Sequence, residues 1–171
     1  MNRTGAILGS ILFFVLVPGT FAGVIPWWIT RWDLSYSSTV LMTVGGLLIL
    51  AGLAALIASF ARFALDGLGT PAPIAPPGTL VVTGLYRFVR NPMYAAVMAI
   101  VLGQALMFYS PGLVAYAVAV WLAFQGFILM YEEPTLRVTF GDPYAAYFAA
   151  VPRWIPKLTP WSPEPPENAA P

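Results

Sequence analysis

Two short stretches of this sequence hold the side chains that can do chemistry, and the first contains a pair of arginines. Arg87 and Arg90 stand three residues apart, immediately before a long apolar stretch. On a helical turn this spacing places both guanidinium groups on one face, where they can bind a carboxylate or a phosphate. The same residues also suit an ordinary positive anchor at the cytoplasmic surface of a membrane, so both interpretations stay open.

The second stretch contains paired carboxylates. Glu132 and Glu133 end another long apolar stretch, and Arg137 follows four residues after Glu133. Neighbouring side chains on a helix point about 100° apart, so we expect one carboxylate to point into a helix bundle and the other to pair with Arg137. Carboxylates at the end of an apolar helix are costly unless paired or solvated, and a plain solvated helix end is the alternative.

Composition excludes several other chemistries. The chain has no Cys and no His, so it lacks the thiolate and imidazole groups that serve as nucleophile, base or zinc ligand, and we expect no metal site. Eight Lys and Arg against seven Asp and Glu leave a net charge of +1, whereas nucleic-acid binding needs a concentrated basic face. We therefore expect apolar or small partners and no nucleic acid.

The elements that position these residues are membrane helices. Of the 171 residues, 59% are hydrophobic and 9% are charged, compared with about 25% charged in soluble domains. A spanning helix needs about 20 apolar residues, and Ser110-Pro111-Gly112 divides the longest uncharged interval with a turn. We predict an all-α integral membrane protein with about four transmembrane helices. They cover residues 6–28, 39–60, 93–109 and 113–131.

The first span is interpreted as a retained helix rather than a secretory signal. Its apolar stretch continues past Pro18 to Trp27 and Trp28 without a small-residue cleavage site. Pro18 lacks an N–H donor and crowds the preceding turn, which predicts a kink.

Small residues predict close helix packing in the second and third spans, because they let helices approach in lipid. They are Ala51, Ala54, Ala55, Ala58, Ala95, Ala99 and Gly103. We interpret Gln104 and Gln125 as hydrogen-bonding between helices rather than lining a polar pocket.

Basic residues predict the orientation. Four spans place Arg31 on one side of the membrane and the other seven Lys and Arg on the opposite side. The positive-inside rule therefore predicts that both termini are cytoplasmic, and we expect an integral protein of a bacterial inner (plasma) membrane. Tryptophans mark the two membrane surfaces. Trp27, Trp28 and Trp32 form the outer anchor, and Trp154 and Trp161 lie at the inner face.

The segments outside the membrane are predicted to be a loop, a short helix and a tail. Residues 66–78 are rich in Gly and Pro, which is typical of a loop. Gly141 suits a helix end, and Asp142-Pro143 suits the start of another helix over residues 143–150. Aromatic residues on one face of this helix suit a position at the headgroups or over a pocket. They are Tyr144, Tyr147 and Phe148, with Val151 following them.

These two blocks resemble the signature of the isoprenylcysteine carboxyl methyltransferase and phospholipid methyltransferase superfamily, membrane enzymes that use S-adenosylmethionine. The first block of that family has the form L-V-x-x-G-x-Y-x-x-V-R-H-P-x-Y-x-G, and here it covers residues 80–96. The second has the form E-E-x-x-L-x-x-x-F-G-x-x-Y-x-x-Y-x-x-x-V-P-R, and here it covers residues 132–153. The order of the blocks and the hairpin between them also agree.

Two positions depart from the family pattern. Asn91 stands in place of the family histidine, and Ala96 stands in place of a glycine. An asparagine donates and accepts hydrogen bonds, but it does not act as a base near neutral pH. The resemblance therefore leaves the methyl acceptor open among a prenylcysteine carboxylate, a phospholipid amine, a thiol and a quinone-like compound.

The resemblance implies a binding site for S-adenosylmethionine built from both blocks. The cofactor carries a sulfonium, an amino acid head and an adenine ring, so it needs acidic, basic and aromatic groups together. The implied cofactor-binding residues are Tyr86, Arg90, Asn91, Pro92, Tyr94, Glu132, Glu133 and Tyr147. Arg90 and Glu133 are also the implied catalytic residues, with Arg137 and Arg153 as weaker candidates.

The leading hypothesis is a membrane methyltransferase whose lipophilic acceptor or lipid enters from the bilayer. The alternative is a non-enzymatic membrane packing or assembly protein that keeps the fold, and a small transporter is disfavoured by the scarcity of ionisable groups in the spans. The expected organisation has three parts. They are a two-helix transmembrane region over 1–65, a methyltransferase core with a cytoplasmic cofactor-binding loop and an interfacial helix over 66–158, and a disordered tail over 159–171.

Overall fold

The protein is an all-α integral membrane protein. The computed structural model describes residues 3–66 and 78–163, and within these ranges every regular element is a helix. The predicted loop over 67–77 and residues 164–171 of the predicted tail lie outside the described residues. In chain order the elements are α1 (Arg3–Gly19), η1 (Thr20–Val24), α2 (Ile25–Thr30), α3 (Thr39–Leu65), η2 (Gly84–Arg87), α4 (Pro92–Met107), α5 (Pro111–Phe127), η3 (Ile128–Glu132), α6 (Glu133–Phe140) and α7 (Asp142–Ala150).

Three helical runs are long and apolar enough to cross a membrane. They cover Ile7–Thr30, Thr39–Leu65 and Pro111–Phe140. The fourth, α4, has 16 residues and extends for about 24 Å, which is less than the roughly 30 Å of a bilayer core. The prediction of about four membrane helices is thus confirmed as three full-length spans and one shorter apolar helix.

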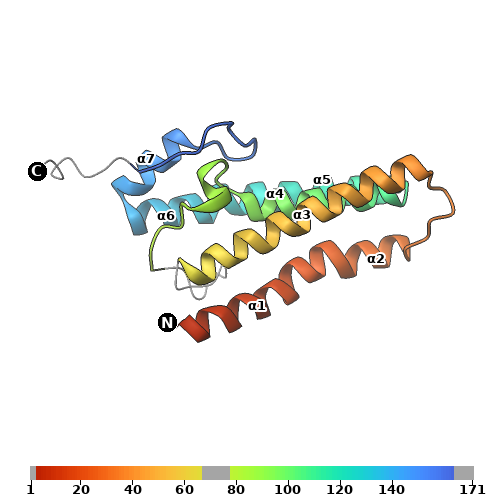
Figure 1. Cartoon of the computed structure of the whole chain (residues 1–171), viewed down its shortest axis with the longest axis horizontal. Coiled ribbons are helices and arrows are strands. Elements are labelled where there is room, and N and C mark those ends of the chain that lie inside the picture. The colour runs from red at the N-terminus through yellow and green to blue at the C-terminus, as the bar shows by residue number, and fades with distance from the viewer. Residues whose placement is uncertain (1–2, 67–77, 164–171) are drawn as a thin grey trace, which may run out of the picture.

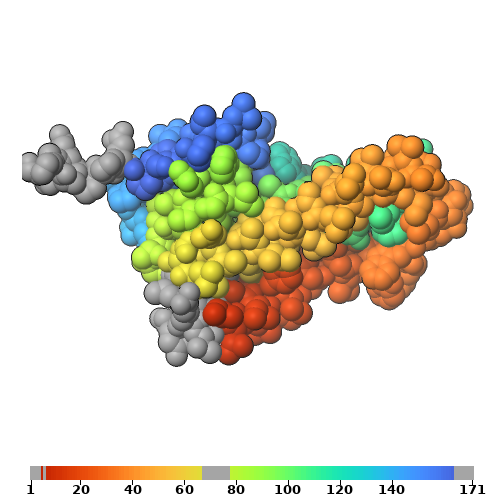
Figure 2. Space-filling view, viewed as in Figure 1, coloured from red at the N-terminus to blue at the C-terminus, as the bar shows by residue number. Residues whose placement is uncertain are grey.

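The helices lie side by side, and the chemistry-bearing segments gather at one end of the bundle. Figure 1 shows the start of α1, the end of α3, and both α6 and α7 at this end, whereas α2, the start of α3 and the α4–α5 turn lie at the other. Figure 2 shows residues 78–91 between α3 and the C-terminal segment on this face. Residues that flank the membrane helices far apart in sequence therefore meet at one membrane surface.

Side-chain caps set the starts of two membrane helices, α3 and α5. The Ser38 hydroxyl accepts a hydrogen bond from the Leu41 amide at 3.3 Å, and the Ser110 hydroxyl accepts one from the Leu113 amide at 3.2 Å. Pro111 occupies the first turn of α5, where its missing N–H costs nothing. The predicted hairpin at 110–112 is confirmed.

The first span does not end at Pro18, but its helical geometry changes shortly after this residue. The helix α1 continues through Pro18 and is followed by the π-helical turn η1. Ile25 donates to Thr20, five residues back, and Pro26 has no N–H, so the carbonyls of Phe21 and Ala22 lose their usual helical donors.

Side chains from two neighbouring helices satisfy those carbonyls. The Gln104 amide donates to the Ala22 carbonyl at 2.7 Å, and the Tyr116 hydroxyl donates to the Phe21 carbonyl at 2.9 Å. Unpaired backbone groups are costly in lipid, so these bonds fix the irregular turn against α4 and α5. The prediction that Gln104 bonds between helices is confirmed.

Glycines bring α3 and α4 into close contact. A Cβ atom on Gly45 would lie 2.5 Å from the Gly103 carbonyl oxygen, and one on Gly103 would lie 2.8 Å from the Gly45 carbonyl oxygen. Gly52 meets α4 in the same way at the Ala96 carbonyl. The prediction of a seam at Gly103 is confirmed, but Ala51, Ala54 and Ala58 are exposed, because the crossing falls on the glycine face of α3.

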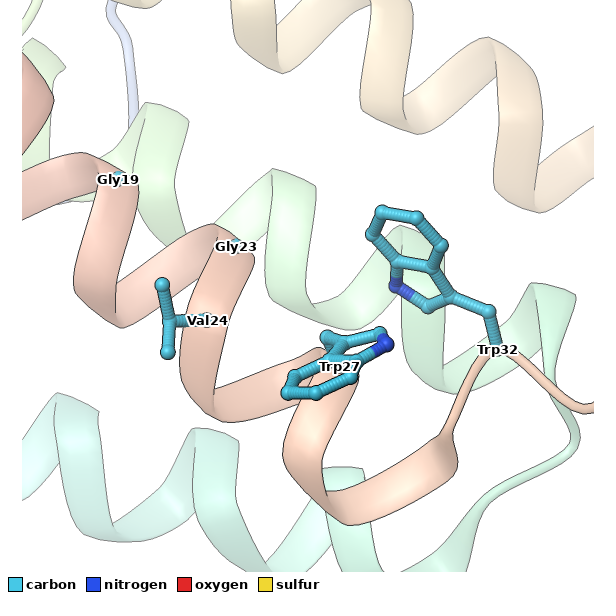
Figure 3. A pocket seen from close by; sticks show the side chains of 5 residues that line it. All are labelled: Gly19, Gly23, Val24, Trp27 and Trp32. Carbon is cyan, nitrogen blue, oxygen red and sulfur yellow. The ribbon is translucent and has the colours of Figure 1, made fainter.

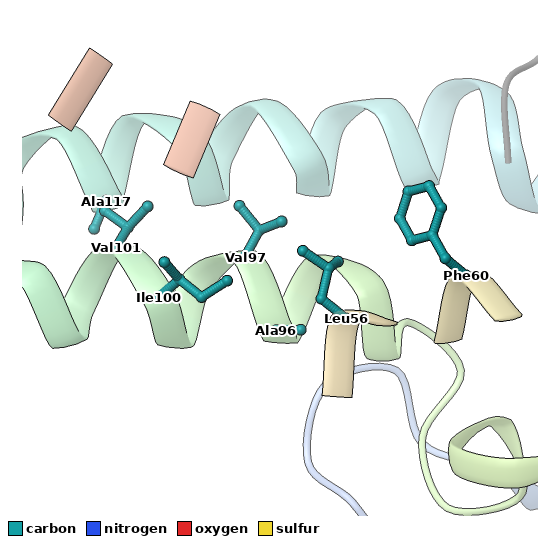
Figure 4. Close-up of a cluster of buried hydrophobic side chains, with 7 residues drawn as sticks. All are labelled: Leu56, Phe60, Ala96, Val97, Ile100, Val101 and Ala117. Atoms are coloured by element: carbon teal, nitrogen blue, oxygen red, sulfur yellow. The ribbon is translucent and has the colours of Figure 1, made fainter. Parts of the chain in front are cut away.

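A buried apolar cluster continues this contact toward the charged end. Leu56 and Phe60 from α3 pack against α4 and Ala117 of α5 (Figure 4). The α4 members are Ala96, Val97, Ile100 and Val101. In lipid such packing, rather than escape from water, holds helices together, so the cluster provides a rigid base for the site.

A C-terminal strap, defined as residues 152–163, runs over the segment before α4. Three backbone bonds join the two segments: Arg90 N to Pro152 O at 2.9 Å, Lys157 N to Phe88 O at 3.0 Å and Trp161 N to Arg87 O at 2.8 Å. Trp161, which lies within the predicted tail over 159–171, is thus held by a contact of the strap.

Candidate functional site

Arg90, Glu132, Glu133 and Arg153, four charged residues of the two blocks, come together where η3 and α6 meet the start of α4 and the strap. Glu133 is central to this site and only 8% exposed. Arg153 donates to its two carboxylate oxygens from Nε and Nη2, both at 2.9 Å. Arg90 Nη1 lies 3.2 Å from Glu133 Oε1 and forms an ion pair with the same oxygen that accepts from Arg153 Nε. Two guanidinium groups thus share one buried carboxylate.

Glu132 also points into the bundle, which the sequence analysis did not predict. Its Oε2 accepts a hydrogen bond from the Tyr94 hydroxyl at 2.8 Å, and no arginine or lysine of the described residues forms an ion pair with it. Both carboxylates turn inward because the π-helical turn η3 precedes α6 and shifts its side chains relative to a continuous α-helix.

Arg137 does not pair with either carboxylate, so that prediction and its alternative of a solvated helix end are both wrong. Its guanidinium carbon lies 4.2 Å from the centroid of the Phe148 ring. Arg90 lies against the same ring at 3.9 Å. The Phe148 ring therefore contacts two cations, the Arg90 guanidinium inside the site and the exposed guanidinium of Arg137.

The two arginines expected to bind one anion have different partners. Arg87 donates from Nε to the Trp161 carbonyl at 2.7 Å and from Nη2 to the Ser162 hydroxyl at 2.6 Å. Arg90 instead turns to Glu133, because η2 ends at Arg87 and the chain leaves the helical turn before Arg90. Arg90 Nε is buried and has no hydrogen-bond acceptor within the described part of the chain.

Three tyrosines line the site from η2 and α7. The Tyr147 hydroxyl donates to the Tyr86 carbonyl at 2.8 Å, and the Tyr147 ring packs against Trp161 with centroids 5.3 Å apart. Burial, followed by the negative charge of Glu132, raises the pKa of Tyr86 well above its usual value. Burial also raises the pKa values of Tyr144 and Tyr147, so all three hydroxyls are neutral at physiological pH.

Asn91 joins the start of α4 to the strap, and Pro92 begins the helix. The Asn91 side-chain amide donates to the Arg153 carbonyl at 3.3 Å, and the residue is 7% exposed. Pro92 is buried at the first position of α4. All eight implied cofactor-binding residues thus lie at this end of the molecule, although Asn91 holds the strap.

Sequence reasoning undervalued Arg153, and it placed Phe148 on an aromatic helix face without predicting its contact with Arg90. Arg153 was only a weaker candidate, yet it forms the bidentate pair with Glu133. A signal for it was present, since a buried carboxylate needs a cation and Arg153 ends the second block. Gln125 was expected to bond between membrane helices, but its Oε1 accepts from Trp154 Nε1 of the strap at 2.8 Å. Trp154 therefore joins the strap to α5.

The donor set suits organic ligands better than a metal ion. Within residues 3–66 and 78–163 no group of three or more His, Cys, Asp or Glu side chains could hold a metal. The site instead combines two carboxylates, two buried or half-buried guanidinium groups and several aromatic rings, which together suit a ligand that carries both charges.

Comparison with known proteins agrees with this arrangement. The family described as phospholipid methyltransferase matches residues 38–143, more than half of the chain. Protein-S-isoprenylcysteine O-methyltransferase B of Arabidopsis thaliana is 36% identical over 78 residues, which cover 45% of this chain and 39% of that protein. The match thus spans about two fifths of the relative's length. From α3 to the start of α7, the chain belongs to the phospholipid methyltransferase family.

Proposed function

We propose that this protein is a membrane methyltransferase that uses S-adenosylmethionine and acts on a lipophilic small molecule or a lipid. The main support is the buried charged cluster of Glu132, Glu133, Arg90 and Arg153 at the end of an apolar helix bundle. Burying charges at a membrane surface is costly. Binding of a ligand that carries one positive and one negative group would explain why the chain has these buried charges. Family membership supports the same activity.

The residues present fit this cofactor. Glu132 lacks a cationic partner among the described residues and suits the cofactor's positive amino group. Arg90 Nε has no acceptor among them and suits its carboxylate. The Phe148 ring lies against Arg90, and Tyr147 bonds to the Tyr86 backbone; these aromatic residues suit an adenine ring. When bound, S-adenosylmethionine supplies an activated methyl group.

The residues of the chain then act mainly by positioning. Arg90 binds the cofactor, and Glu133 acts through Arg90 and Arg153 by holding both in place. The Tyr94 hydroxyl keeps its proton and donates it in a hydrogen bond to the Glu132 carboxylate. Methyl transfer from an activated donor needs alignment and exclusion of water more than a covalent intermediate, which suits a chain without Cys or His.

The acceptor is proposed to enter from the bilayer, and the site is proposed to face the cytoplasm. The helices that lead to the site expose apolar side chains along their length, such as Leu47, Leu50 and Leu122, so a lipophilic molecule can reach it without crossing water. Membranes incubated with methyl-labelled cofactor identify the acceptor as a carboxylate, an amine, a thiol or a quinone-like compound by the labelled product.

Calorimetric titration of detergent-purified protein with S-adenosylmethionine and with its demethylated product tests the cofactor directly. Glu132→Ala and Arg90→Ala are expected to abolish binding, because each removes a charge that the ligand needs. Arg31→Ala, at the other end of the molecule, is the matched control and is expected to bind normally. Natively helical protein that binds neither compound would refute the proposal, and equal affinity in all variants would refute the site.

A second candidate function is a packing or assembly protein without activity. Asn91 replaces the family histidine and its amide is engaged with the Arg153 carbonyl, so it serves structure at a position where the family has an imidazole. Ala96 likewise is buried against α3. A labelled methyl group in any lipid extracted from these membranes contradicts this alternative.

A further inference from the structure

An apolar depression of about 360 Å³ lies at the opposite end of the molecule from the charged site. It is lined by Gly19, Gly23, Val24, Trp27 and Trp32 (Figure 3). Figure 3 shows both indole rings beside the helix that carries the two glycines. Its volume falls within the range of small-molecule sites, about 300–1,000 Å³.

The glycines in this depression leave space that no helix fills. They stand four residues apart in the first span. A Cβ atom on Gly23 would meet no atom within 4 Å, and one on Gly19 would meet only the Phe14 carbonyl at 3.8 Å. Gly45 and Gly103 are different, since a Cβ atom there would collide with the facing backbone. The first pair therefore serves to keep a surface open rather than to let two helices touch.

An unfavourable backbone turn holds Trp32 at this depression. Arg31 and Trp32 both have positive φ, at 51° and 57°, a conformation that residues other than glycine avoid. The turn is held by Arg31 N donating to the Trp27 carbonyl at 2.6 Å and by Trp32 N donating to the Thr30 hydroxyl at 3.1 Å. Strained backbone of this kind concentrates at sites that bind ligands.

A cation stands at the edge of the apolar surface. The Arg31 guanidinium lies 4.7 Å from the centroid of the Trp27 ring, and it is exposed. Within the described residues no carboxylate forms an ion pair with it. Asp33 instead accepts from the Ser35 amide at 2.9 Å. Exposed tryptophans mark the boundary between membrane and water, which is the depth of lipid phosphates.

We propose that this depression binds one phospholipid of the bilayer, with an acyl chain against Gly19 and Gly23 and the phosphate beside Arg31. An apolar surface with one unpaired cation at its edge matches an acyl chain that ends in a phosphate. The lipid fixes the first span to the α2–α3 turn at the membrane surface. This site is separate from the proposed methyl-transfer site, at the other end of the bundle (Figure 1).

Native mass spectrometry of the whole chain in detergent tests this proposal. The probes are palmitoyl-oleoyl phosphatidylglycerol and the diacylglycerol with the same two chains. We expect one phosphatidylglycerol retained per protein and at least tenfold less diacylglycerol. Gly23→Leu fills the depression and is expected to lower phosphatidylglycerol retention at least tenfold, whereas Ala119→Leu, on an exposed face of α5, is expected to retain it.

Further variants separate the two halves of the proposal. Arg31→Gln is expected to bind both probes equally, and Trp32→Ala is expected to lose both, with helicity checked for every variant. Equal retention of the two probes by the wild-type protein would overturn the phosphate contact. Undiminished retention by Gly23→Leu and Trp32→Ala would overturn the site. Cofactor titration of Gly23→Leu is expected to match the wild type, so failure here is distinct from failure of the methyltransferase proposal.

Discussion

Arg153 donates two hydrogen bonds to Glu133, and this pair fastens the C-terminal strap to the end of the last membrane helix. Both bonds are 2.9 Å long, and the two residues are 20 positions apart in the chain. Because Arg90 also contacts the same carboxylate, the pair sets the positions of both arginines. The geometry of the proposed cofactor site thus depends on a salt bridge that crosses between two segments.

Removal of the Glu133 carboxylate is expected to destabilise the protein strongly. Glu133→Ala leaves Arg90 and Arg153 without their partner, and breaking a buried ion pair costs about 3–5 kcal/mol. Arg153→Lys keeps the charge but loses the two-pronged geometry, so a smaller loss of about 1–3 kcal/mol is expected. Thermal unfolding in detergent measures both effects.

The matched control is the exposed pair of Arg62 and Asp66. Its atoms lie 3.6 Å apart and the arginine side chain is 48% exposed, so Arg62→Lys is expected to change stability by less than about 1 kcal/mol. Equal losses at Arg62 and Arg153 would show that the buried pair has no special role.

The glycine crossing of α3 and α4 is expected to tolerate no added methyl group. Gly103→Ala would place a Cβ atom 2.8 Å from the Gly45 carbonyl oxygen, which forces the helices apart and costs about 1–3 kcal/mol. Gly23→Ala is the control, because its added atom meets nothing within 4 Å. Unfolding midpoints of the two variants in the same detergent decide the matter, and a stable Gly103→Ala protein would contradict the expectation.

The helices were predictable because their signals are local. Long uncharged intervals, Ser110 as a cap and Pro111 in the first turn all lie within the sequence they describe, and the structure confirms them. The packing seam was only half predictable. A pattern of small residues does not distinguish alanine from glycine, so the sequence does not tell which face of α3 packs against α4. In the structure the face with Gly45 and Gly52 makes this contact.

The residue types of the site were predictable, but their partners were not. Glu133 meets Arg90 and Arg153 across 43 and 20 positions of the chain, and these distances in sequence carry no periodic signal. The π-helical turn η3 then changes the direction of Glu132 and Glu133. An ideal helix drawn from the sequence therefore sends one carboxylate to Arg137, which the folded chain places against Phe148.

The Phe148 ring is expected to act as a positioning residue for Arg90. Its centroid lies 3.9 Å from the Arg90 guanidinium carbon, and a desolvated cation–π contact is worth about 1–2 kcal/mol. Phe148→Leu is therefore expected to weaken binding of S-adenosylmethionine about tenfold, whereas Phe148→Tyr keeps the ring and the affinity. Calorimetric titration measures this, and unchanged affinity in the leucine variant would remove Phe148 from the site.

Alkaline pH is expected to destabilise the protein through Tyr86. Burial raises the pKa of this hydroxyl above its usual value, so the folded protein keeps a proton that the unfolded chain loses above about pH 10. The stabilisation is complete below pH 10 and falls as pH rises toward the folded pKa, by about 1.4 kcal/mol per pH unit. Between pH 9 and about pH 11 the free energy of unfolding should fall less steeply with pH in Tyr86→Phe than in the wild type. Tyr36→Phe is the control, because Tyr36 is 79% exposed, and identical pH dependence in the two variants would contradict the role of Tyr86.

Single cysteines are expected to show that the charged site faces the cytoplasm. The natural chain has no Cys, so a maleimide that does not cross membranes reports on one introduced thiol alone. Tyr36→Cys lies in the turn between α2 and α3, where the side chain is exposed, and Gly78→Cys lies at the other end, where an added Cβ atom meets nothing within 4 Å. Because the positive-inside rule places the basic end in the cytoplasm, intact cells should label at position 36 and not at 78, and broken cells should label at both. Labelling of position 78 alone in intact cells would show that the orientation is the opposite of the predicted one. The proposed site would then face away from a cytoplasmic supply of cofactor.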